Sequence, residues 1–150
     1  MSDFYQNGII TNLHNLRVQD TESLEKELLA FSKVRPMGLV LPSLYSELLS
    51  PALSKIVDEL TQVKYLSQIV IGLDRATKYE YKDAINYFAK LPQDHVILWN
   101  DGPRLKALDK KLQKMKIAPQ EMGKGRNVWY CFGYILASSK VESVALHDCD

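Results

Sequence analysis

The sequence predicts an α/β fold, in which helices pack on both faces of a mainly parallel sheet. Three observations support this prediction. Short runs of Val, Ile and Leu recur along the chain, amphipathic segments of helical period separate them, and polar turn residues follow each run. Because strands that are buried on both faces read as nearly continuous apolar runs, we expect the order β-α-β-α-β-α-α-β in a covered sheet. The 150 residues are enough for one domain with a hydrophobic core.

Composition and charge narrow the class of protein. Apolar residues make up 46% and charged residues 25% of the chain, which is ordinary for a soluble globular domain. The formal net charge of +1 gives no bulk attraction to nucleic acid or to an acidic membrane. No apolar run approaches the roughly 20 residues that span a bilayer, and the first residues do not form a signal peptide. The two cysteines, Cys131 and Cys149, make no disulfide framework, which favours a cytoplasmic location.

The first 35 residues differ from the rest and are interpreted as an extension with one short helix. Asp20 or Thr21 can cap this helix, which continues to about Lys33. Pro36 ends it, because the residue before a proline avoids the helical region. The domain itself is predicted over residues 36–150.

The first strand and helix of the domain have clear boundaries in the sequence. Met37–Leu41 is a short apolar run that Pro42 and Ser43 are expected to stop. Ser50 is a good helix cap, and a proline suits the first helical position after it. Apolar residues at helical spacing follow: Leu53, Ile56, Val57, Leu60 and Val63.

Two further strands and two further helices follow in alternation. The runs Ile69–Leu73 and His95–Trp99 are predicted strands, and Tyr81–Lys90 is a predicted helix. The inward residues of that helix are expected to be Ala84, Ile85 and Phe88, and the face of the next helix to be Leu105, Leu108, Leu112 and Met115.

The last helix and strand complete the pattern. Gly123-Lys124-Gly125 opens a helix whose apolar positions are Val128, Trp129, Phe132, Ile135 and Leu136, with Trp129 and Phe132 expected in the core. Val141–Leu146 is the fourth predicted strand.

The final strand runs directly into Asp148-Cys149-Asp150. Successive side chains of an extended chain alternate between faces, so Asp148 and Asp150 point the same way. Two carboxylates suit Mg²⁺ or Mn²⁺ bound to a diphosphate, and a second acid in register is not needed for a turn. His147 and Cys149 share the opposite face as a conceivable zinc pair, but two ligands do not make a zinc site.

Acids follow other predicted strands as well. Ligands of open α/β sheets bind beyond the carboxyl ends of the strands, where Asp74 and Asp101 stand. Aspartate is also common after strands because it favours turns and helix caps. The turn interpretation is favoured for Asp101, and both interpretations stay open for Asp74.

Gly123-Lys124-Gly125 is a second candidate ligand site. Glycines allow a close approach of the backbone to a ligand, and the amino end of the following helix favours phosphate. Lys124 adds a positive charge, and Arg126 lies nearby in the sequence. The motif is not a Walker loop, since no Ser or Thr follows the lysine, and in isolation it also fits a plain solvated loop.

The motifs together resemble the amino-terminal half of a GT-A glycosyltransferase, with its Rossmann-like, nucleotide-diphospho-sugar transferase fold. They are Leu-Pro-Ser-Leu at 41–44, an acid after the second strand, Gly-Lys-Gly at 123–125 and Asp-Cys-Asp at 148–150. The most similar group is that of the glucosyl-3-phosphoglycerate and mannosyl-3-phosphoglycerate synthases, and the resemblance covers about Gly38 to Asp150. It implies that residues 36–150 are the nucleotide-sugar-binding half of a truncated GT-A domain.

The resemblance also implies roles for individual residues. Pro42, Ser43 and Leu44 would line the nucleoside pocket, Asp74 would receive the base or ribose, and Lys124 would contact the diphosphate. Asp148 would contact the ribose and, with Asp150, hold the divalent cation. The implied donor-binding set is Pro42, Ser43, Leu44, Glu47, Asp74, Gly123, Lys124 and Asp148. The family usually has Asn-Glu-Glu after Leu-Pro-x-Leu, and here only Glu47 keeps an acid, which leaves the choice between UDP and GDP open.

The function implied is metal-dependent transfer of a hexose from a UDP- or GDP-sugar to a small hydroxylated acceptor such as glycerate or 3-phosphoglycerate. No catalytic residue is assigned, and the 150 residues alone are expected to be inactive. The terminal strand is expected to expose an edge, which would allow a homodimer. The alternatives are a sugar-nucleotide pyrophosphorylase, whose glycine-rich loop after the first strand is missing here, and a non-catalytic nucleotide-binding or interaction domain.

Overall fold

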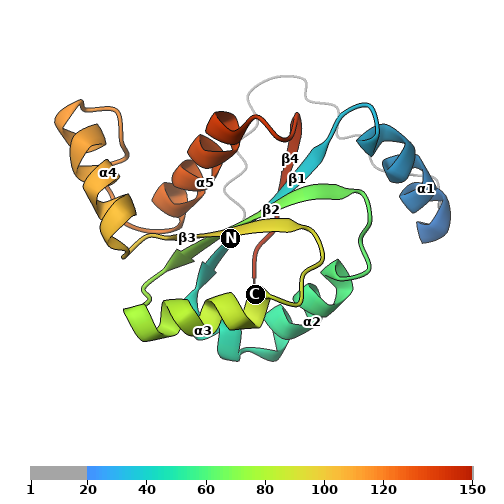
Figure 1. Cartoon of the computed structure of the whole chain (residues 1–150), viewed down its shortest axis with the longest axis horizontal. Coiled ribbons are helices and arrows are strands. Elements are labelled where there is room, and N and C mark those ends of the chain that lie inside the picture. Colours follow the sequence, from blue (N-terminus) through green and yellow to red (C-terminus); the bar gives the residue numbers. More distant parts are fainter. Residues whose placement is uncertain (1–19, 150) are drawn as a thin grey trace, which may run out of the picture.

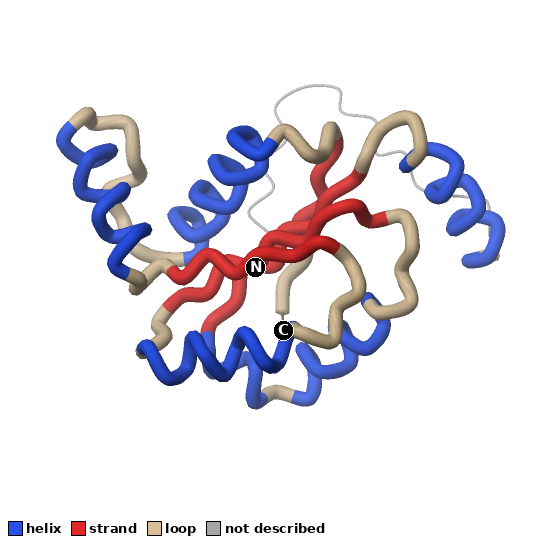
Figure 2. Tube along the Cα trace, in the orientation of Figure 1, coloured by secondary structure: helices blue, strands red, loops and turns tan. Residues whose placement is uncertain are grey.

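The computed structural model describes residues 20–149, which form a four-stranded parallel sheet with flanking helices (Figures 1 and 2). The strands are β1 (Met37–Leu44), β2 (Leu66–Asp74), β3 (Asp94–Trp99) and β4 (Ser143–Leu146), in the order β3-β2-β1-β4. The helices are α1 (Thr21–Ser32), η1 (Tyr45–Leu49), α2 (Pro51–Leu60), α3 (Lys78–Phe88), α4 (Pro103–Lys114) and α5 (Lys124–Ser138). The predicted element order is confirmed. Expectations for residues 1–19 and for Asp150 lie outside the described residues.

Two hydrophobic layers cover the two faces of the sheet. Helices α2 and α3 lie on one face and α5 lies on the other (Figure 1). Neighbouring residues of one strand supply different layers, since Leu41 packs with the α2 and α3 side chains and Val40 packs with those of α5. Both are fully buried, and burial of each such side chain contributes about 1.5–3 kcal/mol. The two middle strands, β1 and β2, are therefore fixed from both faces.

The helix starts follow local capping chemistry. The Asp20 carboxylate accepts a hydrogen bond from the Ser23 N–H at 2.8 Å, and Ser50 caps α2 as predicted. Helix α3 begins at Lys78, earlier than the predicted Tyr81. The reason is a capping box in which Thr77 and Glu80 each accept from the other's backbone N–H.

Strand β1 does not stop at Leu41 as expected but continues through Pro42 to Leu44. The backbone groups of alternate residues point to the same neighbouring strand, and the Val40 carbonyl accepts from the His147 N–H at 3.1 Å. Pro42 therefore faces the β4 side as well. The register between β1 and β4 ends at Val40, so the N–H that Pro42 lacks has no ladder partner to lose.

Several predicted core positions are wrong. The Ile85 side chain is 43% exposed, and Trp129 and Phe132 are 37% and 36% exposed. A helix buries only the stripe that faces the sheet, and on these helices that stripe is narrower than the apolar pattern. Helix α4 has no buried residue, and Leu108 and Met115 are exposed.

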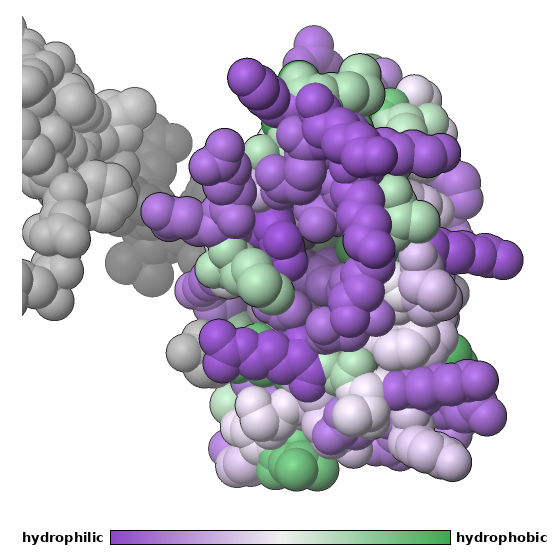
Figure 3. All heavy atoms as spheres, turned by 90° about the vertical axis from the view of Figure 1, so that its left-hand side faces the viewer, coloured by the Kyte–Doolittle hydropathy of each residue, from purple (hydrophilic) through white to green (hydrophobic). Residues whose placement is uncertain are grey.

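Helix α4 stands at one end of the molecule, beside α5 (Figure 1). A groove of about 890 Å³ lies between the two helices and β3, and it is lined mainly by apolar side chains. The view onto this end of the molecule is mostly hydrophilic, with scattered hydrophobic side chains (Figure 3). The basic residues of α4 are Arg104, Lys106, Lys110, Lys111 and Lys114. Among the described residues, no helix has the length and apolar character needed to cross a membrane.

Candidate functional site

The parallel strands end at one edge of the sheet, and this edge collects most of the predicted site residues. Leu44 lies opposite Asp74 in the register between β1 and β2, and Ser43 lies opposite Leu73. The predicted nucleoside-binding residues of β1 and the acid that ends β2 are therefore neighbours. This placement is typical of ligand sites in open α/β sheets.

At the tip of β1, the polar side chains bond to the backbone. The Ser43 side chain is 2% exposed, and its hydroxyl donates to the Leu44 carbonyl at 3.0 Å. The Glu47 carboxylate accepts from the Leu44 N–H at 2.9 Å and closes the first turn of η1. These bonds shape the strand tip. The predicted contacts of Ser43 and Glu47 with a nucleotide stay a prediction.

Asp74 is buried, with 8% exposure, and shapes the turn after β2. One carboxylate oxygen accepts from the Arg75 N–H at 3.0 Å. Arg75 has a φ of 55°, in the left-handed region that non-glycine residues rarely adopt. Helix α3 has Thr77 as its cap, so the capping role considered for Asp74 is not observed. Asp74 holds a strained turn at the carboxyl edge.

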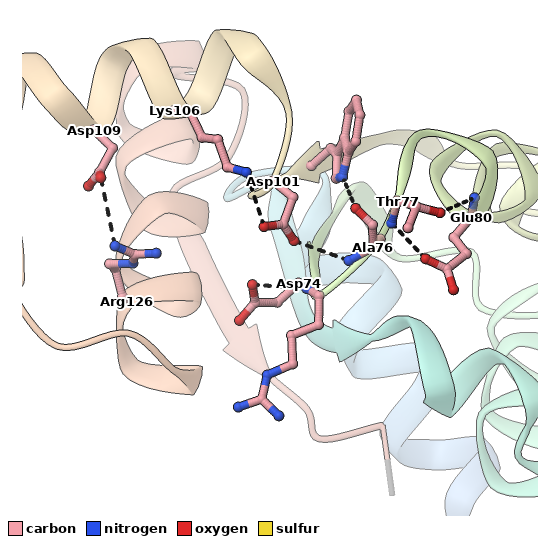
Figure 4. A network of polar contacts seen from close by, with 10 residues as sticks. Asp74, Ala76, Thr77, Glu80, Asp101, Lys106, Asp109 and Arg126 are labelled. Atoms are coloured by element: carbon pink, nitrogen blue, oxygen red, sulfur yellow. Dashed lines mark hydrogen bonds and ion pairs between the residues drawn. The ribbon is translucent and has the colours of Figure 1, made fainter.

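Asp101 connects the end of β3 to the same loop (Figure 4). Its carboxylate accepts from the Ala76 N–H at 3.1 Å and lies 3.5 Å from the Lys106 ammonium. The Trp99 indole N–H donates to the Ala76 carbonyl at 2.7 Å. Both backbone polar groups of Ala76, in the loop after β2, are thus bonded to side chains at the end of β3. No sequence pattern singled out Trp99 or Lys106 for this position.

The amino end of α5 meets the end of β4. Gly123 has a φ of 138°, which favours glycine, and a Cβ there would meet nothing within 4 Å. The Lys124 ammonium lies 2.5 Å from the Asp148 carboxylate, and both side chains are about half exposed. The structure therefore brings together the lysine and the acid that the sequence placed at opposite ends of one αβ unit.

Buried polar contacts fix α5 on the sheet. The Asn127 side chain is 3% exposed, and its amide donates to the Gly72 carbonyl of β2 at 2.8 Å. The Cys131 thiol lies 3.8 Å from the Asn127 amide oxygen. Burial raises the pKa of the Cys131 thiol to about 12, so it stays protonated at neutral pH. The sequence offered one signal for this contact, a glycine inside an apolar strand.

The residues beside Asp148 differ in burial, since His147 is exposed and Cys149 is buried. The Cys149 side chain is buried in the core layer of α2 and α3, whereas Asp148 is exposed. A zinc role for Cys149 with His147 has no support from this arrangement. Within residues 20–149, no three His, Cys, Asp or Glu side chains gather as a metal-binding group. Asp150, the second predicted metal ligand, lies outside the described residues.

Arg126 points away from Lys124, toward α4. Its guanidinium lies 3.7 Å from the Asp109 carboxylate, and the Tyr130 hydroxyl donates to the same carboxylate (Figure 4 shows Asp109 and Arg126). Burial, with the bond to Asp109, raises the pKa of Tyr130 to about 12. This network joins α4 to α5.

Comparison with curated proteins gives two relatives over essentially the whole chain. The chain is 45% identical over 150 residues to glucosyl-3-phosphoglycerate synthase from Persephonella marina. It is 37% identical over 149 residues to glucosyl-3-phosphoglycerate synthase from Methanococcoides burtonii. It spans 37% and 36% of the lengths of these relatives. No protein-family model matches the chain.

Comparison with solved structures gives the same kind of protein. Two crystal structures of glucosyl-3-phosphoglycerate synthase from Mycobacterium tuberculosis match 84% of this chain with a TM-score of 0.50 and 20% identity. The chain covers 37% of those proteins. One contains Mn²⁺, UDP and glucosyl-3-phosphoglycerate, and the other contains Mn²⁺, UDP and phosphoglyceric acid. The predicted fold and the resemblance to these synthases are confirmed.

Proposed function

With similarity to glucosyl-3-phosphoglycerate synthases along the whole chain as the premise, we propose that these residues form the donor-binding part of a GT-A glycosyltransferase. The reaction is transfer of glucose from UDP-glucose to 3-phosphoglycerate, with Mn²⁺ or Mg²⁺ as cofactor. UDP is preferred over GDP as the donor nucleotide because the solved relatives were crystallised with UDP. The proposed location is the cytoplasm, where the buried thiols Cys131 and Cys149 stay reduced.

The observation that carries this proposal is the contact between Lys124 and Asp148. It puts a cation at the amino end of a helix and a carboxylate at the end of a strand within 2.5 Å of each other. A divalent cation bound to a diphosphate needs both kinds of group, an acid for the metal and positive charge for the remaining phosphate oxygens. The nucleoside would extend from there along the tips of β1 and β2, toward Asp74.

Charge on the leaving diphosphate builds up as the bond to the sugar breaks. The ammonium of Lys124 and the positive amino end of the α5 dipole supply fixed positive charge for it. Asp148, with Asp150, would hold the divalent cation, which adds Lewis-acid stabilisation of the same charge when bound. Gly123 lets the backbone approach the phosphates closely, since it has no side chain.

Asp74 would bind the nucleoside through hydrogen bonds. Its carboxylate is held at the sheet edge by the Arg75 N–H, and a carboxylate accepts hydrogen bonds from a ribose hydroxyl or a base N–H. Because Asp74 lies opposite Leu44, the base would rest against the apolar tip of β1. Specificity for the base then depends on side chains within this strand pair.

Isothermal titration calorimetry tests the proposal. UDP and GDP are each titrated into the 150-residue protein with and without Mn²⁺. We expect UDP to bind in the presence of Mn²⁺ and the metal-dependent part to disappear in Asp148→Ala and in Asp150→Ala.

Asp58→Ala is the matched control, because it also removes a surface aspartate that pairs with a lysine, Lys90, but on α2. Its UDP affinity should equal that of the wild type. Binding of neither nucleotide by the folded wild-type protein would favour a non-catalytic interaction domain instead.

A further inference from the structure

A buried amide links the two parts of the proposed donor site. Asn127 is one helical turn after Lys124, and Gly72 is two residues before Asp74. The Asn127 amide donates to the Gly72 carbonyl at 2.8 Å. One hydrogen bond therefore connects the helix that carries the phosphate-binding end to the strand that carries the nucleoside-binding end.

The fit around this bond leaves little freedom. A Cβ on Gly72 would lie 1.9 Å from the Asn127 amide oxygen and 2.7 Å from the Cys131 sulfur. The helix thus approaches the strand as closely as a residue without a side chain permits. The Asn127 side chain is 3% exposed, so its bond is made in a dry layer, where hydrogen bonds are stronger than in water.

The rest of the α5 contact is mainly apolar and less directional. Cys131 and Ile135 pack against Val40 and Val70, and such packing resists separation of the helix from the sheet more than sliding along it. The Asn127 hydrogen bond holds the amino end of α5 on β2, and a second one, from the Ser138 hydroxyl to the Gln68 side chain at 3.3 Å, holds its carboxyl end. Sliding of α5 would move Lys124 relative to Asp74.

We propose that Asn127 is a positioning residue that sets the distance between the phosphate-binding end of α5 and the nucleoside-binding tip of β2. This inference rests on the proposed function. It names the residue that aligns the two parts of the proposed donor site. Asn127 touches no substrate and acts through Lys124. A misplacement of about 1 Å can cost on the order of 100-fold in reaction rate. A displaced Lys124 would in the same way contact the diphosphate less well, and calorimetry measures this as a lower affinity.

The test compares UMP with UDP, each titrated in the presence of Mn²⁺. UMP reports on the nucleoside side, and the affinity ratio of UDP to UMP reports on the alignment of the diphosphate. In Asn127→Leu, which keeps the number and branching of the side-chain heavy atoms but not the amide, we expect this ratio to fall about tenfold while UMP affinity stays within about twofold of the wild type. Asn127→Ser serves in the same way if the leucine variant does not fold.

Ile135→Ala is the control, because Ile135 is also buried on α5 but packs in the apolar cluster with Val40 and Val70. It should lower the melting temperature without changing the ratio. An unchanged ratio in folded Asn127 variants, or an equal loss of UMP and UDP affinity, would overturn the positioning role. Failure of the wild-type protein to bind UDP would instead overturn the proposed function on which the inference depends.

Discussion

Individual side chains of the candidate site are held by backbone groups of the strand tips. Asp74 and Glu47 accept from N–H groups, and Asp101 accepts from the loop after β2. Such bonds orient the tips before any ligand arrives, which reduces the entropy lost on binding. Lys124 and Asp148 differ, because they contact each other at the surface.

Replacement of Lys124 is expected to lower nucleotide affinity without changing the stability of the fold. An exposed ion pair contributes less than about 1 kcal/mol, so Lys124→Met should leave the melting temperature nearly unchanged. The same change removes a positive charge from the proposed diphosphate site, and we expect UDP affinity with Mn²⁺ to fall about tenfold. Thermal melting and calorimetry measure the two effects. Wild-type affinity in Lys124→Met would remove this residue from the site.

Gly72 offers a test of close packing. Gly72→Ala should destabilise the protein by about 2–3 kcal/mol, because the new Cβ would overlap the Asn127 amide. Gly133→Ala is the control, since nothing lies within 4 Å of a Cβ at that exposed helix position. It should be neutral or stabilise by up to about 1 kcal/mol. Equal urea midpoints for the two variants would contradict the described contact.

Candidate site residues that belong to a recognisable motif could be predicted from the sequence. Residues that matter through a contact with a distant part of the chain could not. Gly-Lys-Gly and Asp-x-Asp are visible as patterns. Asn127 is an ordinary polar residue in an apolar helix, and its role becomes visible only when Gly72 is placed below it. Trp99 was assigned to a strand, but its bond to the Ala76 carbonyl depends on the path of a loop.

At the scale of elements, helix α4 lies outside the two core layers of the sheet. It has no buried residue and is joined to α5 through Asp109, which interacts with Tyr130 and Arg126. The apolar pattern of α4 predicted a core-facing helix. That pattern could not show that α4 would stand beside the sheet, because the position depends on the whole helix layer.

The link between α4 and α5 predicts a pH dependence of stability. The pKa of Tyr130 is raised from 10.0 to about 12 in the folded protein, so the folded state keeps its proton where the unfolded state loses it. The stabilisation is complete below pH 10 and is lost as the pH rises toward 12. Urea unfolding at a series of alkaline pH values should show this loss in the wild type. Tyr130→Phe should show a smaller loss, and an identical pH profile would contradict the assignment.

The order of the elements along the chain was predictable because each strand contains a short apolar run and segments of helical period separate these runs. The residues at which the strands and helices begin and end were harder to predict. Strand β1 passes through Pro42 because β4 has already left that side of the strand, which is a property of the register and not of the proline. Helix α3 starts early because Thr77 and Glu80 form a capping box that the apolar pattern does not include.

At the scale of the whole molecule, the fold places the proposed nucleotide-binding edge next to an edge strand. Strand β4 pairs with β1, and in the described residues the sheet has no neighbour beyond it. The chain spans 37% of the length of the Persephonella marina synthase.

The activity of the 150 residues is a separate prediction. We predict that the polypeptide binds UDP with Mn²⁺ but does not transfer glucose from UDP-glucose to 3-phosphoglycerate. Release of UDP in a coupled assay, with product identified by mass spectrometry, measures this. Sustained formation of glucosyl-3-phosphoglycerate would show that the described half-site is sufficient for catalysis.

The most direct test of the central claim locates the metal–nucleotide complex on the molecule. Mn²⁺ with UDP is added to isotope-labelled protein, and the loss of amide NMR signals is compared with a Mg²⁺–UDP reference. The account predicts broadening of the amides of Asp74, Lys124 and Asp148, at the carboxyl edge of the sheet, with α1 and the far end of α2 unaffected. Broadening centred on the groove between α4 and α5, or no localised broadening, would contradict it.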